Sequence, residues 1–514
     1  MGGTGHWKVE AKEAEMSRFS CRRQPSWSIP IAAPQNYLPG TDPASWFTAR
    51  PRSAPIVIGG VLVAIGIGWL AVREPRYAIA VCVGVALIVA VVIRPIFGAL
   101  TLIAVVPALS GLLPGVPVPN VRITELLIGT VSVTLVVVAR RSTSIKWRPI
   151  DWLLLAYGLL WTFDGVLGAV LTPGRLSLSS WGTVVGQLQF FLLYRSLKVT
   201  LRTKEDRRLA LQWLFITGGV IALLAIFQEV RVPGVVNLIL RISGSASLRE
   251  AGGIVRATGP FSNWAALAGY LVPLVLVALC LGLGNTVVNH KKTKFALAVV
   301  LLLALFLTAE LSVIVTLIVG TYALGWRYGR GRTVMRWLGI GLVAISVGAG
   351  SVLAHRLGAQ FSTAAGTGRP AFVPQTLGFR WLIWTGQYIP AILQRPLTGW
   401  GVVLPNSIRW PDPESQYIEF LIQGGLPLLI MFGLLFDGMI REAKRATRCL
   451  DPTDRAMGEA LLVTVVLLGV INFIWPFLSN GGMPQMLWCL FALLPPVLGR
   501  PHSQAFLAIP QSVR

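Results

Sequence analysis

The sequence is poor in charge, in cysteine and in histidine. Charged residues make up 13% of its 514 residues, which is about half the usual share in a soluble protein, so a soluble globular protein is not indicated. The four histidines are scattered and predict no metal cluster. The cysteines show no CxxC pair and no regular spacing, so neither a disulfide framework nor a zinc site is indicated. They are Cys21, Cys82, Cys280, Cys449 and Cys489.

Apolar and basic residues are in excess instead. Hydrophobic residues make up 54% of the chain, and 45 lysines and arginines against 21 acidic residues give a formal net charge of +24. On one face of a soluble protein this charge would indicate nucleic-acid binding. In a membrane protein the same excess marks cytoplasmic segments. The composition therefore predicts an all-α integral membrane protein in a lipid bilayer, with no nucleic-acid partner.

Apolar runs of about twenty residues, the length that a spanning helix needs, recur along the chain. The run 295–326 is too long for one span, and basic segments flank it at 285–294 and 327–336. The positive-inside rule places both segments in the cytoplasm, so we predict two short passes meeting near Glu310 and about 14 transmembrane helices in all. The other predicted spans are 54–72, 77–93, 95–113, 123–139, 150–170, 179–197, 209–228, 262–284, 337–354, 419–440, 457–478 and 484–499.

The same rule orients the chain with its N-terminus in the cytoplasm. Residues 1–52 have mixed charge and proline but no apolar h-region, so we predict a disordered cytoplasmic extension and not a cleaved signal peptide. The predicted organisation continues with transmembrane helices 1 to 11 over 53–354, a large extracytoplasmic loop over 355–418, helices 12 to 14 over 419–499, and a cytoplasmic tail over 500–514.

Two long connections lie on the predicted outer side, at 229–261 and 355–418. Long loops in compact proteins are usually functional or disordered. The stretch 377–394 predicts a short amphipathic helix lying at the membrane surface. An aromatic belt without a catalytic part explains its aromatic residues equally well. The residues that recur at helical spacing are Trp381, Trp384, Tyr388 and Ile392.

Few ionisable residues lie in or beside the predicted outer leaflet, and such groups are functional hypotheses by default. They are Arg122, Glu125, Asp164, Arg256, Glu310, Arg380, Asp412 and Glu414. Asp164 and Glu310 lie near the outer ends of their helices, where water or a backbone cap can satisfy them. Arg122 and Glu125 are three residues apart and can pair with each other.

Two segments carry motifs. Arg256-Ala-Thr-Gly-Pro-Phe-Ser-Asn263 opens a span. The second segment runs through Arg380-Trp-Leu-Ile-Trp384, Arg395-Pro-Leu-Thr-Gly-Trp-Gly401, Glu414-Ser-Gln-Tyr417 and Gln423-Gly-Gly-Leu426. In order, spacing and sidedness these motifs resemble the O-antigen ligase and polymerase superfamily, polytopic glycosyltransferases that act on lipid-linked glycans.

This resemblance implies a GT-C-like fold and a metal-independent transfer without a cofactor. The donor would be a glycan on a polyprenyl diphosphate, the acceptor a hydroxyl of a glycan or lipid, and the place the outer face of the cytoplasmic membrane, in cell-envelope polysaccharide biosynthesis. The sequence departs from the family twice. The helix pair keeps Thr308 but lacks the family's arginine, and Glu414 stands where many members have histidine.

The chemistry itself requires a cation for the leaving diphosphate and a base for the acceptor. Guanidinium groups bind diphosphate without proton transfer, and Arg256 and Arg380 are placed for this. A partly desolvated carboxylate can take the acceptor proton; Glu414 is the first candidate and Asp412 the second, with inversion by single displacement. The candidate substrate-binding residues are Asn263, Trp384, Trp400, Tyr417 and Asp412.

Structural alternatives stay open for these residues. Glu414 could be a solvated loop carboxylate that caps the next helix, Arg256 an anchor at the headgroup layer, and Tyr417 part of a helix start. A secondary transporter or lipid-glycan flippase is the rival class, since the broken hairpin near Glu310 is typical of transporters. An inactive scaffold is a third possibility, and the sequence does not distinguish a ligase from a polymerase.

Overall fold

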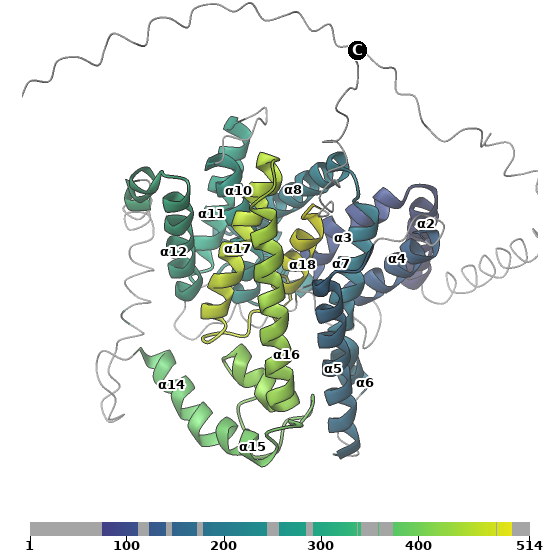
Figure 1. Cartoon of the computed structure of the whole chain (residues 1–514), viewed down its shortest axis with the longest axis vertical. Helices are drawn as coiled ribbons and strands as arrows, with labels where there is room; N and C mark the ends of the chain where they lie inside the picture. The colour runs from purple at the N-terminus through teal and green to yellow at the C-terminus, as the bar shows by residue number, and fades with distance from the viewer. Residues whose placement is uncertain are drawn as a thin grey trace, which may run out of the picture. The chain divides into compact units, whose positions relative to one another are not determined.

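The computed structural model describes residues 75–110, 123–139, 146–171, 178–243, 256–283, 291–336, 338–340, 358, 374–479 and 481–495. These residues form helices, and no strand occurs among them. The helices labelled in Figure 1 and their neighbours are α2 (Pro75–Ile93), α3 (Pro95–Leu109), α4 (Ile123–Ala139), α5 (Pro149–Leu171), α6 (Leu178–Val185), α7 (Leu188–Thr200), α8 (Lys204–Glu229), α9 (Val235–Ser243), α10 (Trp264–Leu283), α11 (Lys291–Leu307), α12 (Leu311–Arg327), α14 (Gln375–Ile383), the π-helical turn η3 (Trp384–Tyr388), α15 (Ile389–Gln394), α16 (Gln416–Ala446), α17 (Pro452–Ile471) and α18 (Met483–Leu493).

The prediction of an all-α membrane protein is confirmed. Four described helices are long and apolar enough to cross a bilayer: α5, α8, α10 and α16. The count of fourteen spans is not supported. Several other apolar helices have only 10–17 residues within the described part, and at 1.5 Å per residue such a helix falls short of a hydrocarbon core of about 30 Å.

Helix boundaries agree with the predicted spans in most described places. The long run 295–326 does form two helices, α11 and α12, that meet at Thr308–Glu310. The span predicted at 179–197 is wrong as a single helix, because the chain breaks between α6 and α7, where Gly186 and Gln189 donate only to residues three positions back. Residues 1–52, 54–72 and 500–514 and most of 337–354 lie outside the described residues.

Helix α10 is the most enclosed of the four long helices. In its most apolar stretch, 78% of the residues are buried inside the protein. It packs against α8, α11, α12, α17 and α18. Helix α16 packs between α5 and α17 (Figure 1). Helix α10 is apolar on all its sides, as expected for a helix that is buried nearly all round and has no polar face.

Helix α16 is broken near its start. Gly425 has a left-handed backbone (φ 66°, ψ −160°), which glycine adopts without steric cost. Two residues further on, Pro427 has no N–H, and the N–H of Leu426 points out of the helix. The carbonyls of Ile422 and Gln423 therefore lack their helical donors and need partners elsewhere.

The loop 396–401 supplies these partners. The N–H groups of Trp400 and Gly401 donate to the carbonyls of residues 422 and 423 at 2.7 and 2.8 Å, and the carbonyl of Pro396 accepts from Leu426 at 2.8 Å. The Pro-Leu-Thr-Gly-Trp-Gly motif is thus a main-chain clamp on the break in α16. We call it the α16 clamp.

Helix α5 closes the clamp from the other side. A Cβ at Gly168 would lie 2.6 Å from the carbonyl oxygen of Trp400, and a Cβ at Gly424 would collide with the carboxylate of Asp164. Asp164 lies deeper in the protein than its place near a helix end predicts. It is 5% exposed, and among the described residues its Oδ2 has no hydrogen-bond partner.

Candidate active site

The two named residues of the Arg-x-x-x-Trp motif, Arg380 and Trp384, both bind the loop that carries the candidate base, Glu414. The Arg380 guanidinium donates to Oε2 of Glu414 at 3.0 Å, and each side chain is 12% exposed. One helical turn later, the indole N–H of Trp384 donates to the carbonyl of Pro413 at 2.6 Å. Residues four apart lie on one helix face, so this spacing directs both side chains to the same segment.

The loop before Glu414 is held along its length. The Gln387 side-chain carbonyl accepts the backbone N–H groups of Arg409 and Trp410 at 2.8 and 3.2 Å. The hydroxyl of Tyr388 donates to the carbonyl of Trp410 at 2.8 Å. The predicted interfacial stretch is helical from Gln375 to Gln394, with a π-helical turn at its centre that contains these two residues.

Glu414 has a left-handed backbone, with φ 55°. Such a conformation costs about 1–3 kcal/mol in a residue other than glycine and clusters at functional sites. Glu414 does not cap α16, because Ser415 occupies the N-cap position. The Glu414 carboxylate accepts from Arg380 instead, so the capping alternative is wrong.

The second arginine, Arg256, pairs with Glu310, which lies between α11 and α12. Arg256 is 5% exposed, its Nη1 lies 3.8 Å from Oε2 of Glu310, and its guanidinium lies 4.2 Å from the centre of the Trp264 ring. The same indole donates to Oε2 of Glu310 at 3.1 Å, and the hydroxyl of Ser312 donates to Oε1 at 2.8 Å. Glu310 therefore organises this pair.

The Arg256 motif is anchored by its neighbours. The side-chain carbonyl of Gln228, at the end of α8, accepts the N–H groups of Thr258 and Gly259 at 3.0 and 2.8 Å. The N–H of Ala257 donates to the carbonyl of Leu307, at the end of α11, at 3.1 Å. The motif thus bridges two helix ends, which fixes where the arginine stands.

The two ion pairs are electrostatically coupled. Burial raises the pKa of Glu310, and the hydrogen bonds it accepts and the charge of Arg380 lower it. Burial also raises the pKa of Glu414; Arg380 opposes this rise, while Asp412 and Glu310 add to it. Each pair therefore senses a charge of the other. We call Arg256, Glu310, Arg380 and Glu414 the arginine–glutamate cluster.

The remaining predicted site residues lie around this cluster in different roles. Asn263 accepts the N–H of Ala266 at 2.8 Å and so caps the start of α10. Trp400 belongs to the α16 clamp, and its indole donates to Ala391 at 2.9 Å. Tyr417 points to α17, where its hydroxyl donates to the carbonyl of Gly469 at 2.6 Å. Asp412 is exposed, two residues before Glu414.

Sequence reasoning missed several side chains that support the site. Gln228, Trp264 and Gln387 hold its segments, and nothing in their local sequence marks them except that Trp264 follows directly on the first motif. Glu419 is a further buried carboxylate, which accepts hydrogen bonds from Gln416, Gln423 and Ser479. The predicted pair between Arg122 and Glu125 cannot be placed, because Arg122 lies outside the described residues.

The fold and the cluster define a class: an all-α multi-pass membrane protein with buried arginines and carboxylates, three of them in connections between helices and one, Arg380, in the short helix α14. Within this class, residues 296–433 match the O-antigen ligase family, which confirms the resemblance to the O-antigen ligase superfamily. The match runs from α11 into α16 and includes Glu310, Arg380, Glu414 and the α16 clamp. No curated protein matches the chain. The family supports a glycosyl-transferring enzyme of cell-envelope glycan biosynthesis.

Proposed function

We propose that the protein transfers a glycan from a polyprenyl diphosphate carrier to an acceptor hydroxyl on the outer face of the cytoplasmic membrane. The observation that carries the proposal is the arginine–glutamate cluster. It contains two cations and two carboxylates from separate segments, which include the types of group that a diphosphate leaving group and an acceptor hydroxyl require, a cation and a base. The O-antigen ligase match supports lipid-linked glycans as the substrate class.

In this proposal Arg256 and Arg380 bind the diphosphate. Both guanidinium groups are largely buried, so their attraction for phosphate oxygens is screened less than at an exposed surface. Planar guanidinium groups also offer two parallel N–H donors to one phosphate. Trp264 and Glu310 would hold Arg256 in place. Trp384 and Tyr388 fix the loop that carries Glu414, and Glu414 in turn would position Arg380.

Glu414 is the proposed general base, and donor binding would prepare it. In the free protein its carboxylate is engaged by Arg380. When the diphosphate takes over this guanidinium, Glu414 loses its stabilising partner and gains negative charge nearby, and both changes raise its pKa further. A more basic carboxylate then faces the acceptor only when the donor is bound. Asp412 is the second candidate.

The reaction would be a single displacement with inversion, without a metal or other cofactor. The acceptor oxygen forms the new bond to the anomeric carbon and its proton passes to Glu414. The bond from that carbon to the phosphate oxygen breaks, and the polyprenyl diphosphate leaves with the electron pair, its charge stabilised by the two arginines. Trp384, Trp400, Tyr417 and Asn263 would shape the surrounding glycan site.

The proposal includes the topology from the sequence: a GT-C-like arrangement of fourteen passes with the cluster outside and both termini in the cytoplasm. Short helices such as α3 and α4 would complete their passes through flanking residues or a locally thinned bilayer. Cysteines introduced into 140–149 and 355–373 would test it. A membrane-impermeant thiol reagent applied to cells should label only the second segment; labelling of the first would refute the assigned orientation.

The decisive experiment is transfer by purified protein given a lipid diphosphate donor and a labelled acceptor. Glu414→Gln should abolish transfer while the protein level stays normal. Asp437→Asn is a matched control, because Asp437 is a half-exposed carboxylate paired with Arg441 in α16. Full transfer by the Glu414→Gln variant would remove Glu414 as the base. Movement of the donor across vesicles without transfer would favour the flippase class instead.

A further inference from the structure

The helical stretch α14–η3–α15 has two different sides. Its inward side holds the loop that carries Glu414, through Arg380, Trp384 and Tyr388. The stripe that the sequence predicts through Trp381, Trp384 and Tyr388 is therefore divided in the structure, because only Trp381 remains largely exposed, at 66%. The exposed side of the stretch has no role in the proposed transfer.

This exposed side carries a row of apolar residues, whose positions differ by four or by eight. Residues four apart lie on one side of a helix, and the π-helical turn η3 takes up one extra residue per turn, so the row continues across it. We call this row the outward face. It consists of Leu377, Trp381, Ile389 and Leu393, which are 46, 66, 40 and 71% exposed.

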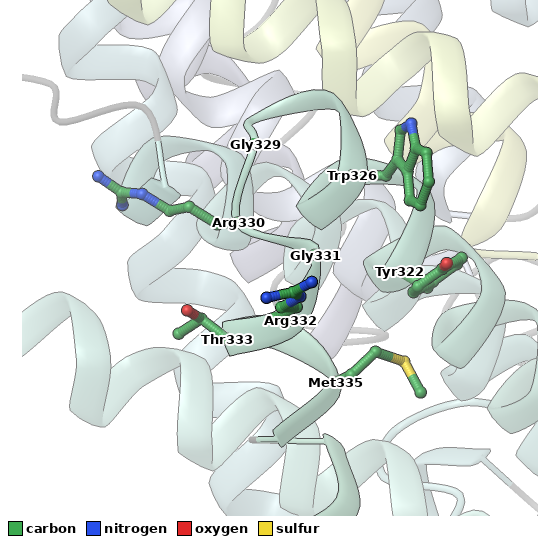
Figure 2. A pocket seen from close by; sticks show the side chains of 8 residues that line it. All are labelled: Tyr322, Trp326, Gly329, Arg330, Gly331, Arg332, Thr333 and Met335. Carbon is green, nitrogen blue, oxygen red and sulfur yellow. The ribbon is translucent and has the colours of Figure 1, made fainter. Parts of the chain in front are cut away.

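The outward face is uncharged, unlike the surroundings of another exposed tryptophan. Trp326, which is 72% exposed, lines a hollow of about 560 Å³ together with Arg330 and Arg332. Figure 2 shows these two arginine side chains pointing in different directions from the turn after α12. The outward face has no such cations, and residues 375–394 contain no acidic residue. A partner of the outward face must therefore be apolar.

The stretch ends at the level where two membrane-spanning helices end. The α16 clamp directly follows α15 and is hydrogen-bonded to α16, and the carbonyl of Trp400 in the clamp lies against Gly168 of α5. Both α5 and α16 are long and apolar enough to cross a bilayer. Helix α5 ends at Leu171, about 5 Å beyond Gly168 at the helical rise per residue. The Leu393 end of the outward face is therefore close to the boundary between hydrocarbon and head groups.

We infer that the outward face is inserted into the leaflet next to it, which is the outer leaflet in the proposed topology. Leu377, Ile389 and Leu393 lie among the upper acyl chains, and Trp381 lies at the boundary with the head groups, where tryptophan is enriched. Burial of this apolar face drives the insertion, as for other interfacial helices. Lipid fits better than a second copy of the chain, because lipid already surrounds the helices at this level.

The inserted stretch links the membrane to the candidate site, since its inward side holds the loop of Glu414. The inference itself does not depend on the proposed transfer, because a transporter with this fold would have the same membrane contact.

The test is photocrosslinking of the full-length protein in vesicles of phosphatidylcholine. The amino acid p-benzoylphenylalanine replaces Leu393 or, in a second variant, Ile389; on illumination it reacts with C–H bonds that it touches. Mass spectrometry of the intact protein identifies the adduct. We expect an added mass of one phospholipid at both positions, with melting temperatures close to that of the wild type because both side chains are exposed.

Gln394 is the matched control position. It is also exposed and adjoins Leu393, but it is rotated from it by about 100° around the helix and so does not belong to the outward face. The yield of lipid adduct at Gln394 should be several times lower than at Leu393. Equal yields at these two positions, or no lipid adduct at Leu393 and Ile389, would overturn the inference. A crosslinked dimer at Leu393 would overturn it too, because it would identify a second copy as the partner.

Discussion

Neutralising one member of the Arg380–Glu414 pair should damage the protein more than neutralising both. At a separation of 3.0 Å, the attraction between two unit charges is about 5 kcal/mol for an effective dielectric constant near 20. Desolvation of both groups offsets most of this energy, but a single substitution leaves the other charge buried without its partner. We therefore expect Arg380→Gln to destabilise the protein by about 3 kcal/mol, near the lower end of the range for buried pairs.

The double variant Arg380→Gln with Glu414→Gln should recover most of that stability. No buried charge remains in this variant, so we expect a net loss of only about 1 kcal/mol from the lost hydrogen bond. Unfolding of the detergent-solubilised protein, followed by tryptophan fluorescence, measures the stability of wild type, both single variants and the double variant. The coupling energy follows from the four values.

Activity should not follow stability in this cycle. If the two residues act in transfer, the double variant is stable and inactive, whereas a purely structural pair gives a variant that is stable and active. Transfer by the double variant at the wild-type rate would therefore refute both assigned roles. Additive losses of stability, with no coupling between the two substitutions, would refute the buried ion pair itself.

Three further predictions concern the surroundings of this pair. Because burial raises the pKa of Glu414, its base form should accumulate only above the ordinary glutamate range, so the wild-type transfer rate should rise with pH through the raised pKa. The fold should lose stability over the same pH window, since the native state holds the proton more tightly than the unfolded state. Glu414→Gln should remove this loss from pH-dependent melting curves. Glu310→Gln keeps hydrogen-bonding atoms but loses the charge that positions Arg256. It should therefore raise the apparent KM for the donor, lowering transfer far more at limiting than at saturating donor. An unchanged donor KM would contradict this role. Gly399→Ala should cost at least about 2 kcal/mol in melting experiments, because φ is 59° and the new Cβ would meet the backbone of Gln423, whereas Gly386→Ala, with open space around its Cβ, should be nearly neutral.

The sequence predicted those parts of the fold that follow from hydropathy and charge. The two basic segments around 295–326 were enough to predict a helix pair meeting near Glu310, because charge sidedness acts along the chain. The break between α6 and α7 was missed although Gly186 lies at it, because an isolated glycine is tolerated inside a helix and does not by itself mark a break. The count of fourteen spans is supported only for four long helices among the described residues, because apolar composition does not determine how long a helix continues.

For the candidate site, the motifs identified Arg380 and Glu414, which the structure pairs directly. Arg256 was also identified, but not its partner, because Glu310 lies 54 positions away and was assigned to water or a cap. Spatial neighbours such as Gln228, which holds the Thr258–Gly259 turn, depend on long-range packing and leave no local pattern. Only the relative placement of helix ends brings such residues together.

The α16 clamp has a consequence for the loop that it encloses. Hydrogen bonds from 400 and 401 to 422 and 423 tie the two ends of a segment of about twenty residues, so this segment is closed like a ring without a covalent crosslink. Closing a loop in advance removes the closure part of the entropy that its ordering would otherwise cost, about 3 kcal/mol for twenty residues. Glu414 lies on this ring, but Arg380, Trp384, Gln387 and Tyr388, which hold the ring from outside, belong to the preceding helical stretch. A chimera should therefore keep the fold when it exchanges the ring together with that stretch, and lose stability when its junctions fall inside the ring.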